Sequence, residues 1–292
     1  MNLFHAYTSS STMLVRMSEI DVSRDSVDFL DLLQHSSGGN ADERLEAVAF
    51  ECLANTIADR RAESLLSVLG FQDDFLCFTI AGYPKHTYAG ARASIHKVVQ
   101  DLGGGNCIVG SRDGVCVALM SPQGAVTPEI TCTNMMSSFD AMAPVCIGPL
   151  RRGTIGACRS IRAALFSIAA APALSTIPRP MRADDVLPER ALLGDDDAVD
   201  ELVNSVYASL QPSGPDDPTL ETVHTFLRTG SSLEATAKEL SVHPNTVRYR
   251  LKRAAETTGW DATDPREAYV LHTAIALGRM RAFASQRDAG KR

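Results

Sequence analysis

The spacing of apolar residues changes along the chain and divides it into distinct stretches. Residues 42–69 carry apolar positions at helical spacing and end at Gly70, which predicts helical structure there. Residues 1–70 are therefore expected to form an N-terminal helical segment.

The middle stretch, residues 71–210, alternates between short apolar runs and segments with one apolar helical face. Two apolar runs flank Asp113-Gly114, a strong hairpin signal. The expected elements are, in order, a strand at 75–83, a helix from Tyr88, the hairpin at 106–120, a partly helical stretch at 127–142, a short strand at 143–150 and a helix at 154–173. This β-α-β-β-α-β order predicts a ferredoxin-like split sheet.

An acidic connector follows the middle stretch. Asp195, Asp196 and Asp197 stand together, and we expect an exposed turn and helix start there rather than a metal site. The segment QPSGPDDP at 211–218 has the composition of a linker, so the domain boundary is expected there.

The last 75 residues contain paired start and stop signals for helices, which predict an all-α C-terminal domain at 218–284. The signals are a start at Asp217-Pro218, a stop at Gly230, a capping box at Ser231-x-x-Glu234 before a helix at 233–240, a turn at 241–243, a start at Pro244 for a helix over 244–257, a stop at Gly259 and a start at Asp264-Pro265.

Two short helices joined by a three-residue turn form a helix-turn-helix. At 100° per residue, Val247, Leu251 and Ala254 fall on one side of the second helix and are expected to face the core. The candidate DNA-binding residues are the polar and basic side chains on or beside the opposite face, namely Asn245, Thr246, Arg248, Tyr249, Arg250, Lys252 and Arg253.

These side-chain types suit DNA. Asn245 and Thr246 can hydrogen-bond base edges, and arginines can contact guanine or phosphates. A recognition helix enters the major groove with its N-terminal residues nearest the bases. A basic helix face can also be simply solvated, but the preceding helix and the tight turn favour DNA binding. For His243 two roles stay open, a structural N-cap and a phosphate contact.

The charge distribution supports a localised polyanion-binding surface. The net charge is −7, yet residues 221–292 carry 12 Lys and Arg against 8 Asp and Glu, a balance of +4. Residues 1–220 carry 16 against 27, a balance of −11. A basic end on an acidic body predicts a polyanionic partner for that end, here double-stranded DNA.

The cysteines and the most apolar stretch indicate a cytoplasmic protein. All seven cysteines precede residue 160 without C-x-x-C pairs or zinc-like spacing to histidine, as expected of reduced, mostly buried thiols. The N-terminus lacks the layout of a signal peptide. The segment 161–177 contains Arg162 and is too short to span a membrane, so a core helix and no membrane partner are expected.

The segment from SLEATAKEL through VHPNTVRYRL to AIALGRM resembles the C-terminal helix-turn-helix domain of the PucR-like family, the purine-catabolism and sugar-diacid (CdaR-like) regulators. The likeness covers about residues 218–281, and the middle stretch is more loosely similar to the family's degenerate GGDEF-like domain. The resemblance implies an α+β chain that acts as a transcription factor, usually as a dimer or higher oligomer, and whose upstream domains sense a metabolite, such as a small-molecule effector, or another signal. Only about 70 residues precede the middle domain, fewer than most sensor domains of the family, so either the chain is truncated or its input reaches it differently.

Two other classes of function remain as alternatives. Active GGDEF domains are cyclase-like signalling enzymes that bind nucleotides, but the hairpin sequence GSRDGV offers Asp113 as a lone carboxylate, and no Walker motif or Rossmann fingerprint occurs. We therefore expect no catalytic residue, no metal site and no cofactor. The GGDEF-like domain at 71–210 is instead expected to serve in dimerisation or in signal relay. The third class is an interaction protein that no longer binds DNA. The retained basic and polar residues argue against it, and a steep loss of binding with salt would distinguish the two.

Overall fold

The structure is a computed structural model that describes residues 41–72, 74–214 and 217–289. The first 40 residues of the expected N-terminal helical segment lie outside the described residues.

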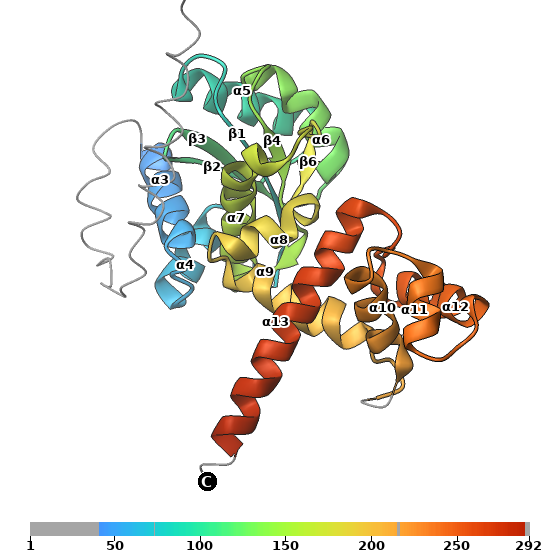
Figure 1. The fold of residues 1–292 in the computed structure, drawn as a ribbon. Helices are drawn as coiled ribbons and strands as arrows, with labels where there is room; N and C mark the ends of the chain where they lie inside the picture. Colours follow the sequence, from blue (N-terminus) through green and yellow to red (C-terminus); the bar gives the residue numbers. More distant parts are fainter. Residues whose placement is uncertain (1–40, 73, 215–216, 290–292) are drawn as a thin grey trace, which may run out of the picture. The chain divides into compact units, whose positions relative to one another are not determined.

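A mixed sheet organises the middle part of the chain (Figure 1). Its strands are β1 (Leu76–Gly82), β2 (Cys107–Arg112), β3 (Val115–Met120), β4 (Val145–Ile147), the two-residue β5 (Arg151–Arg152) and β6 (Met181–Arg182). The order is β2-β3-β1-β4-β6, with β5 pairing the start of β1. The first four strands pair antiparallel and β6 pairs β4 in parallel. The order of the first four strands confirms the predicted ferredoxin-like sheet.

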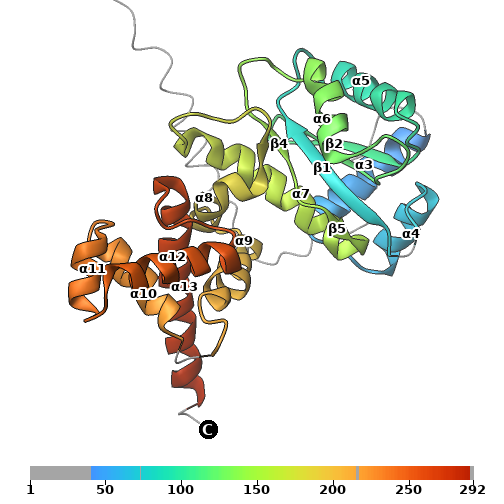
Figure 2. The same cartoon turned by 90° about the vertical axis from the view of Figure 1, so that its right-hand side faces the viewer.

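Both faces of this sheet are covered by helices, which explains why its strands are apolar almost throughout. The helices are α3 (Ala41–Ala54), α4 (Arg60–Val68), α5 (Tyr88–Asp101), α6 (Pro128–Met135) with η1 (Met136–Ser138), and α7 (Gly153–Ala170) with η2 (Ala171–Ala173). Alternate residues of β1 face opposite sides: Cys77 and Ala81 pack in the core with α3 and α7, and Phe78 and Ile80 pack with α5 and α6. Figure 2 shows the sheet between these two helix layers.

The predicted turn between β2 and β3 is confirmed. Asp113 and Gly114 both have positive φ, 53° and 80°, as the two central residues of a type I′ hairpin do. The Phe50 ring fills the space beside Gly110 and excludes a side chain there, since a Cβ atom would lie 1.9 Å from the ring. Helix α3 therefore lies directly against the edge strand β2.

The helical stretch expected over 42–69 consists of two helices. The chain breaks after Ala54, where Thr56 has a φ of 61°, and a new helix begins after Asp59. The Asp59 carboxylate accepts hydrogen bonds from the backbone N–H groups of Arg61 (2.9 Å) and Ala62 (3.1 Å). This N-cap starts α4 inside a stretch whose apolar spacing alone looks continuous.

The C-terminal part is all helical. It contains α10 (Pro218–Arg228), α11 (Leu233–Glu239), α12 (Pro244–Thr258) and α13 (Pro265–Ala289), preceded by η3 (Ala183–Val186), α8 (Leu187–Leu192), α9 (Asp196–Glu201) and the π-helical turn η4 (Leu202–Tyr207). The predicted starts at Asp217-Pro218 and Asp264-Pro265 are confirmed, since both aspartates accept hydrogen bonds from the first turn of their helices.

The C-terminal core begins upstream of the linker at 211–218. Leu187, Leu202, Val206 and Leu210 are buried together with the apolar residues of α10, α12 and α13. The connector helices thus belong to the same core as the helix-turn-helix. Sequence composition marks the linker but does not reveal this packing.

The contact between α13 and η4 depends on a glycine. Gly278 faces the Tyr207 ring so closely that a Cβ atom would lie 2.3 Å from a ring carbon. A π-helical turn is uncommon and changes the direction of the side chains that follow it. Here it places Tyr207 on the helix backbone of α13.

The seven cysteines are free thiols, buried except for the half-buried Cys107. Burial raises the pKa of Cys77 and of Cys116 to about 12, so these thiols stay protonated at neutral pH. Among the described residues, Gly153–Ala173 has the length and composition of a membrane span, but 67% of its apolar window is buried inside the protein. This is the pattern of a core helix.

Candidate DNA-binding surface

Local sequence fixes both ends of α12. The His243 Nδ1 atom accepts a hydrogen bond from the Asn245 backbone N–H at 3.2 Å, which makes His243 the N-cap. Pro244 occupies the first helical position, where its missing N–H has no cost. Gly259 ends the helix with a φ of 79°, and its N–H donates to the Ala255 carbonyl at 2.9 Å.

The preceding helix α11 is capped one residue later than the sequence predicts. Ser232, and not Ser231, accepts the Ala235 N–H through its hydroxyl at 3.2 Å. Ser231 has a φ of 61° and donates its N–H back to Phe226, so it belongs to the turn that ends α10. Ser241, with a φ of 53°, then opens the tight turn between α11 and α12.

The predicted inward face of α12 is confirmed. Val247, Leu251 and Ala254 are buried in the helical core. The opposite face is open: Asn245, Arg248, Tyr249 and Lys252 are exposed, and Tyr249 exposes 66% of its surface. Thr246, Arg250 and Arg253 are partly buried at the sides of the helix.

Two of the seven candidate side chains contact other parts of the protein. Arg250 donates through Nη1 to the hydroxyl of Thr222 in α10 at 3.2 Å. Arg253 donates to the Ser213 hydroxyl at 3.0 Å and lies 3.4 Å from an Asp217 carboxylate oxygen. Asp217 is buried, and hydrogen bonds from Thr219 and Ser213 lower its pKa to about 2. Arg250 and Arg253 thus join α12 to the start of α10.

The exposed candidates cluster toward the N-terminal half of α12. Arg248 donates through Nη1 to the Asn245 side-chain oxygen at 2.8 Å, so the two side chains lie together at the helix start. Lys252 lies 3.8 Å from Glu256, one turn later, with both side chains largely in solvent. An exposed pair of this kind is weak, about 0.3–0.5 kcal/mol, and leaves the Lys252 charge able to exchange partners. The helix therefore presents an amide, a guanidinium, a phenol and an ammonium group outward.

Comparisons with known proteins agree with this geometry. Residues 219–277 match the family described as the PucR C-terminal helix-turn-helix domain, and residues 54–170 match the GGDEF-like domain. The crystal structure of a regulator of polyketide synthase expression from Bifidobacterium adolescentis is 56% identical, covers 87% of this chain and 98% of that chain, and has a TM-score of 0.81.

The chain belongs to the PucR-like family of transcriptional regulators.

More distant relatives match the chain in part. An uncharacterized protein of Mycobacterium tuberculosis is 42% identical over 164 residues, which are 56% of this chain and 39% of that protein. The purine catabolism regulatory protein of Bacillus subtilis is 35% identical over 81 residues, 27% of this chain and 15% of that protein. The match spans about two-fifths of the mycobacterial protein and a smaller share of the Bacillus regulator.

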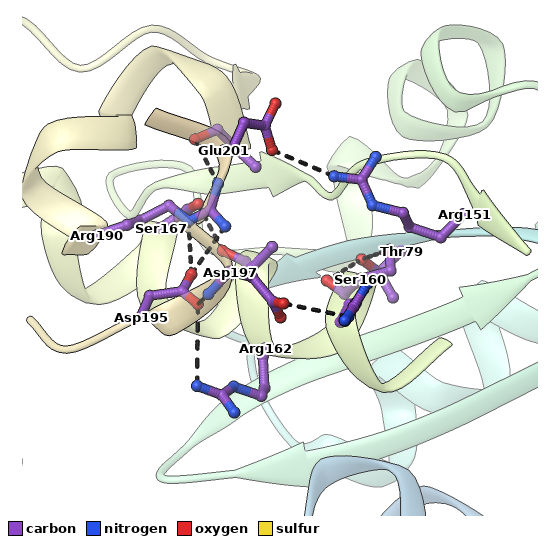
Figure 3. Close-up of polar contacts among 12 residues, drawn as sticks. Thr79, Arg151, Ser160, Arg162, Ser167, Arg190, Asp195, Asp197 and Glu201 are labelled. Atoms are coloured by element: carbon purple, nitrogen blue, oxygen red, sulfur yellow. Dashed lines mark hydrogen bonds and ion pairs between the residues drawn. The ribbon is translucent and has the colours of Figure 1, made fainter. Parts of the chain in front are cut away.

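In this PucR-like regulator a second polar cluster joins the GGDEF-like part to the connector (Figure 3). Arg190 and Asp195 form a buried ion pair, with Nε and Nη2 lying 2.9 and 2.8 Å from one carboxylate oxygen. From the sheet side, Arg151 pairs with Glu201 at 3.3 Å and Arg159 pairs with Asp197 at 3.1 Å. A cavity of about 550 Å³ lies against this cluster.

The prediction for the acidic run was wrong in one respect. Asp195 does begin a helix, since its carboxylate accepts the Asp197 N–H at 3.2 Å. It is fully buried rather than exposed, because Arg190 supplies a buried counter-charge five residues earlier. The described residues contain no group of three or more His, Cys, Asp or Glu side chains arranged to hold a metal ion. The sequence shows the acids but not the long-range arginines that face them.

The hairpin of the GGDEF-like domain is engaged in structural contacts. Arg112 donates to the Ala54 carbonyl at 3.0 Å and to the Glu51 carboxylate at 2.8 Å. The side chain next to the lone acid Asp113 therefore ties β2 to the end of α3.

Proposed function

We propose that this transcriptional regulator binds specific sequences in double-stranded DNA through α12, as a cytoplasmic homodimer. The observation that carries the proposal is the exposed polar face at the start of α12, opposite the three side chains buried in the core. A surface helix needs only one buried face, so its other face is free to contact a partner. The family match over residues 219–277 supports the same conclusion.

The seven candidate residues divide into three roles. Asn245, Thr246 and Tyr249 face base edges in the major groove, and Arg248 recognises a guanine or an adjacent phosphate. Lys252 contacts a backbone phosphate. Arg250 and Arg253 hold α12 on α10 through Thr222 and Asp217 and reach phosphates at the edge of the groove.

We also propose a domain organisation consistent with these contacts. Residues 1–70 form an N-terminal segment, 71–210 a regulatory domain without catalytic activity, and 218–284 the DNA-binding domain, whose core also includes apolar residues of the connector helices before residue 211. The response to a small-molecule effector passes through the ion pairs that join Arg151 and Arg159 to Glu201 and Asp197. The relatives whose names state a role are regulators, which supports a domain that relays a signal rather than one that catalyses a reaction.

Selection of bound sequences from a random DNA pool by the full chain, at near-physiological salt, tests the proposal. We expect enrichment of one sequence present twice, because two copies of a short recognition helix read two half-sites. In measurements on that site, Arg248→Ala should weaken binding by about 1–3 kcal/mol, and Asn245→Ala should relax the preference at one base position.

Arg60→Ala is the matched control, because it removes an exposed arginine from α4 in the GGDEF-like part. It should leave both affinity and preference unchanged. Equal loss for all sequences in both α12 variants would contradict base readout by Asn245. No enrichment by a folded protein would contradict sequence-specific binding in the absence of effector.

The relay has its own test. Arg159→Glu reverses a charge that faces Asp197 and should change the DNA affinity of the full chain about fivefold or more, a usual size for coupling between sites. A fragment starting at residue 183 lacks Arg159 and measures α12 without the relay. Unchanged affinity of the full-chain variant would contradict the relay but not DNA binding.

A further inference from the structure

Helix α13 is longer than the core beneath it. Val270, Leu271, Ala274 and Ile275 are buried, and Gly278 packs on Tyr207. From residue 279 to residue 287, every residue is exposed. Figure 1 shows α13 continuing toward the C-terminus past α10, α11 and α12. Isolated helices of this length are marginal in water, so the exposed end calls for a packing partner.

The exposed side of α13 carries a continuous stripe along its whole length. Its members are Tyr269, His272, Ala276, Met280, Phe283 and Arg287. At 100° per residue they lie within about 80° of the helix circumference, opposite the buried face. Met280 and Phe283 expose 67% and 63% of their surface and Tyr269 exposes 40%. The spacing of three and four residues is that of a helix that pairs with another helix.

The stripe is symmetric about Ala276. Tyr269 and Phe283 each lie seven residues from it, and His272 and Met280 each lie four residues from it. In an antiparallel pair centred on Ala276, Tyr269 therefore meets Phe283 of the partner subunit and His272 meets Met280 of the partner subunit. The small side chain stands at the centre, where the two helices approach most closely.

The charges at the two ends are complementary in the same arrangement. Arg287 falls opposite Pro265 of the partner subunit, between the acidic side chains at the start of that helix, Asp264 and Glu267. A positive charge at the C-terminal end of one helix and negative charges at the N-terminal end of the other also follow the helix dipoles. A two-fold axis repeats both contacts, as a dimer interface of this symmetry requires.

We propose that the exposed stripe of α13 is the surface on which a second copy of this chain docks, as an antiparallel helix pair centred on Ala276. The proposal rests on the homodimer in the proposed function and names its interface. The stripe fits a second copy better than an unrelated partner, because it is complementary to itself. Its aromatic side chains, Tyr269 and Phe283, meet each other in the pair, and Arg287 meets the acidic start of the other helix.

Sedimentation of the full chain without DNA is the first test. Wild-type protein should sediment as a dimer at tens of micromolar. Phe283→Glu and Met280→Glu should each raise the dimer dissociation constant more than tenfold. Ala282→Glu is the matched control, because it adds the same charge at an exposed position of the same helix, turned about 120° from the centre of the stripe, and it should leave the dimer intact.

Cysteine cross-linking tests the direction of the pair. Ala276→Cys should form a disulfide-linked dimer under mild oxidation. Phe283→Cys alone should not, because the two copies of residue 283 lie about 21 Å apart along an antiparallel pair. Tyr269→Cys combined with Phe283→Cys should cross-link. The six buried native thiols, with the half-buried Cys107, make wild-type protein the background control.

Several outcomes overturn the proposal. A dimer that survives Phe283→Glu uses another surface, and self-linkage of Phe283→Cys shows parallel pairing. The chain could also be a monomer in which a cysteine at position 276 reacts with maleimide only after residues 1–40 are removed. That result would show that residues 1–40 of the same chain, and not a second copy, cover the stripe. None of these measurements uses DNA, so failure of the α13 interface and failure of DNA binding are separate results.

Discussion

Helices α7 and α12 both carry arginines, but they use them in opposite ways. Eleven of the 18 residues of α7 are buried, against three of the 15 residues of α12. On α7, Arg159 pairs with Asp197, and Arg162 lies 3.9 Å from Asp195. On α12, Arg248 contacts only its neighbour Asn245 among the described hydrogen bonds and ion pairs.

The difference shows that the role of an arginine depends on which groups it contacts, and not on its being an arginine. The α7 arginines neutralise acids of the connector and hold two parts of one chain together. Even within α12 the two uses coexist, since Arg250 and Arg253 contact α10 and the linker while Arg248 and Lys252 face solvent. Only the second kind remains fully available to a nucleic acid.

The largest expected effect comes from removing the support beneath α12. A fragment of residues 218–292 lacks Leu187, Leu202, Val206 and Leu210, which are buried in the same core. It should show no cooperative thermal transition by circular dichroism and should bind a hydrophobic dye. The matched fragment 183–292 keeps these residues and should unfold cooperatively. Equal cooperativity in both fragments would show that the connector adds little to the core.

The next largest effect is expected from breaking the buried ion pair between Arg190 and Asp195 in the connector. Arg190→Met should lower the free energy of unfolding by about 3 kcal/mol, because the buried Asp195 loses its close ion-pair partner and keeps only Arg162 at 3.9 Å. Urea unfolding at pH 7 measures this loss. Adding Asp195→Leu should recover most of it, leaving about 1 kcal/mol for the lost N-cap of α9. A loss below 1 kcal/mol in the single variant would mean that water reaches Asp195.

The Asp217 carboxylate gives a smaller effect that depends on pH. Its pKa of about 2 lies below the ordinary value of 3.8, so the ionised form is stabilised by folding. That stability is fully present well above the unfolded pKa of 3.8 and is lost as the pH falls through the folded pKa of about 2. Asp217→Asn keeps an N-cap acceptor but carries no charge. Its stability should be below wild type at pH 7, and the gap should narrow in urea unfolding as the pH is lowered toward 2; a constant gap would contradict the assignment.

The smallest effect concerns stability on α12 itself. Arg248→Ala should change the free energy of unfolding by no more than about 0.5 kcal/mol, as at most exposed positions. Arg250→Ala should cost about 0.5–1.5 kcal/mol, because it removes the hydrogen bond to Thr222. Thermal unfolding of both variants in parallel checks the difference. The reverse order would place Arg248, and not Arg250, among the residues that hold α12 in place.

The helix-turn-helix is the part that the sequence predicts best, because its signals are local. His243, Pro244 and Gly259 act within α12, and the 3.6-residue period of Val247, Leu251 and Ala254 shows which side is buried. The capping serine of α11 was misplaced by one residue, since Ser231 and Ser232 are adjacent and the pattern alone does not say which has positive φ.

Several of the features that the sequence does not predict involve contacts that no local pattern shows. Arg250 and Arg253 bond residues 28 and 40 positions away, so their contacts cannot be found in the helix sequence. The burial of Asp195 depends on how the chain folds back after Gly194. Similarly, composition places a linker at 211–218 but does not show that Leu187 and Leu202 pack against α13 on the far side of it.

The narrow buried face of α12 has a consequence for how such a regulator diversifies. Three positions anchor the helix, while Asn245, Arg248, Tyr249 and Lys252 are exposed. Those four side chains can change without opening a cavity or leaving a buried group unpaired. Under the proposed DNA-binding role, one scaffold can therefore acquire a new operator through a few surface substitutions.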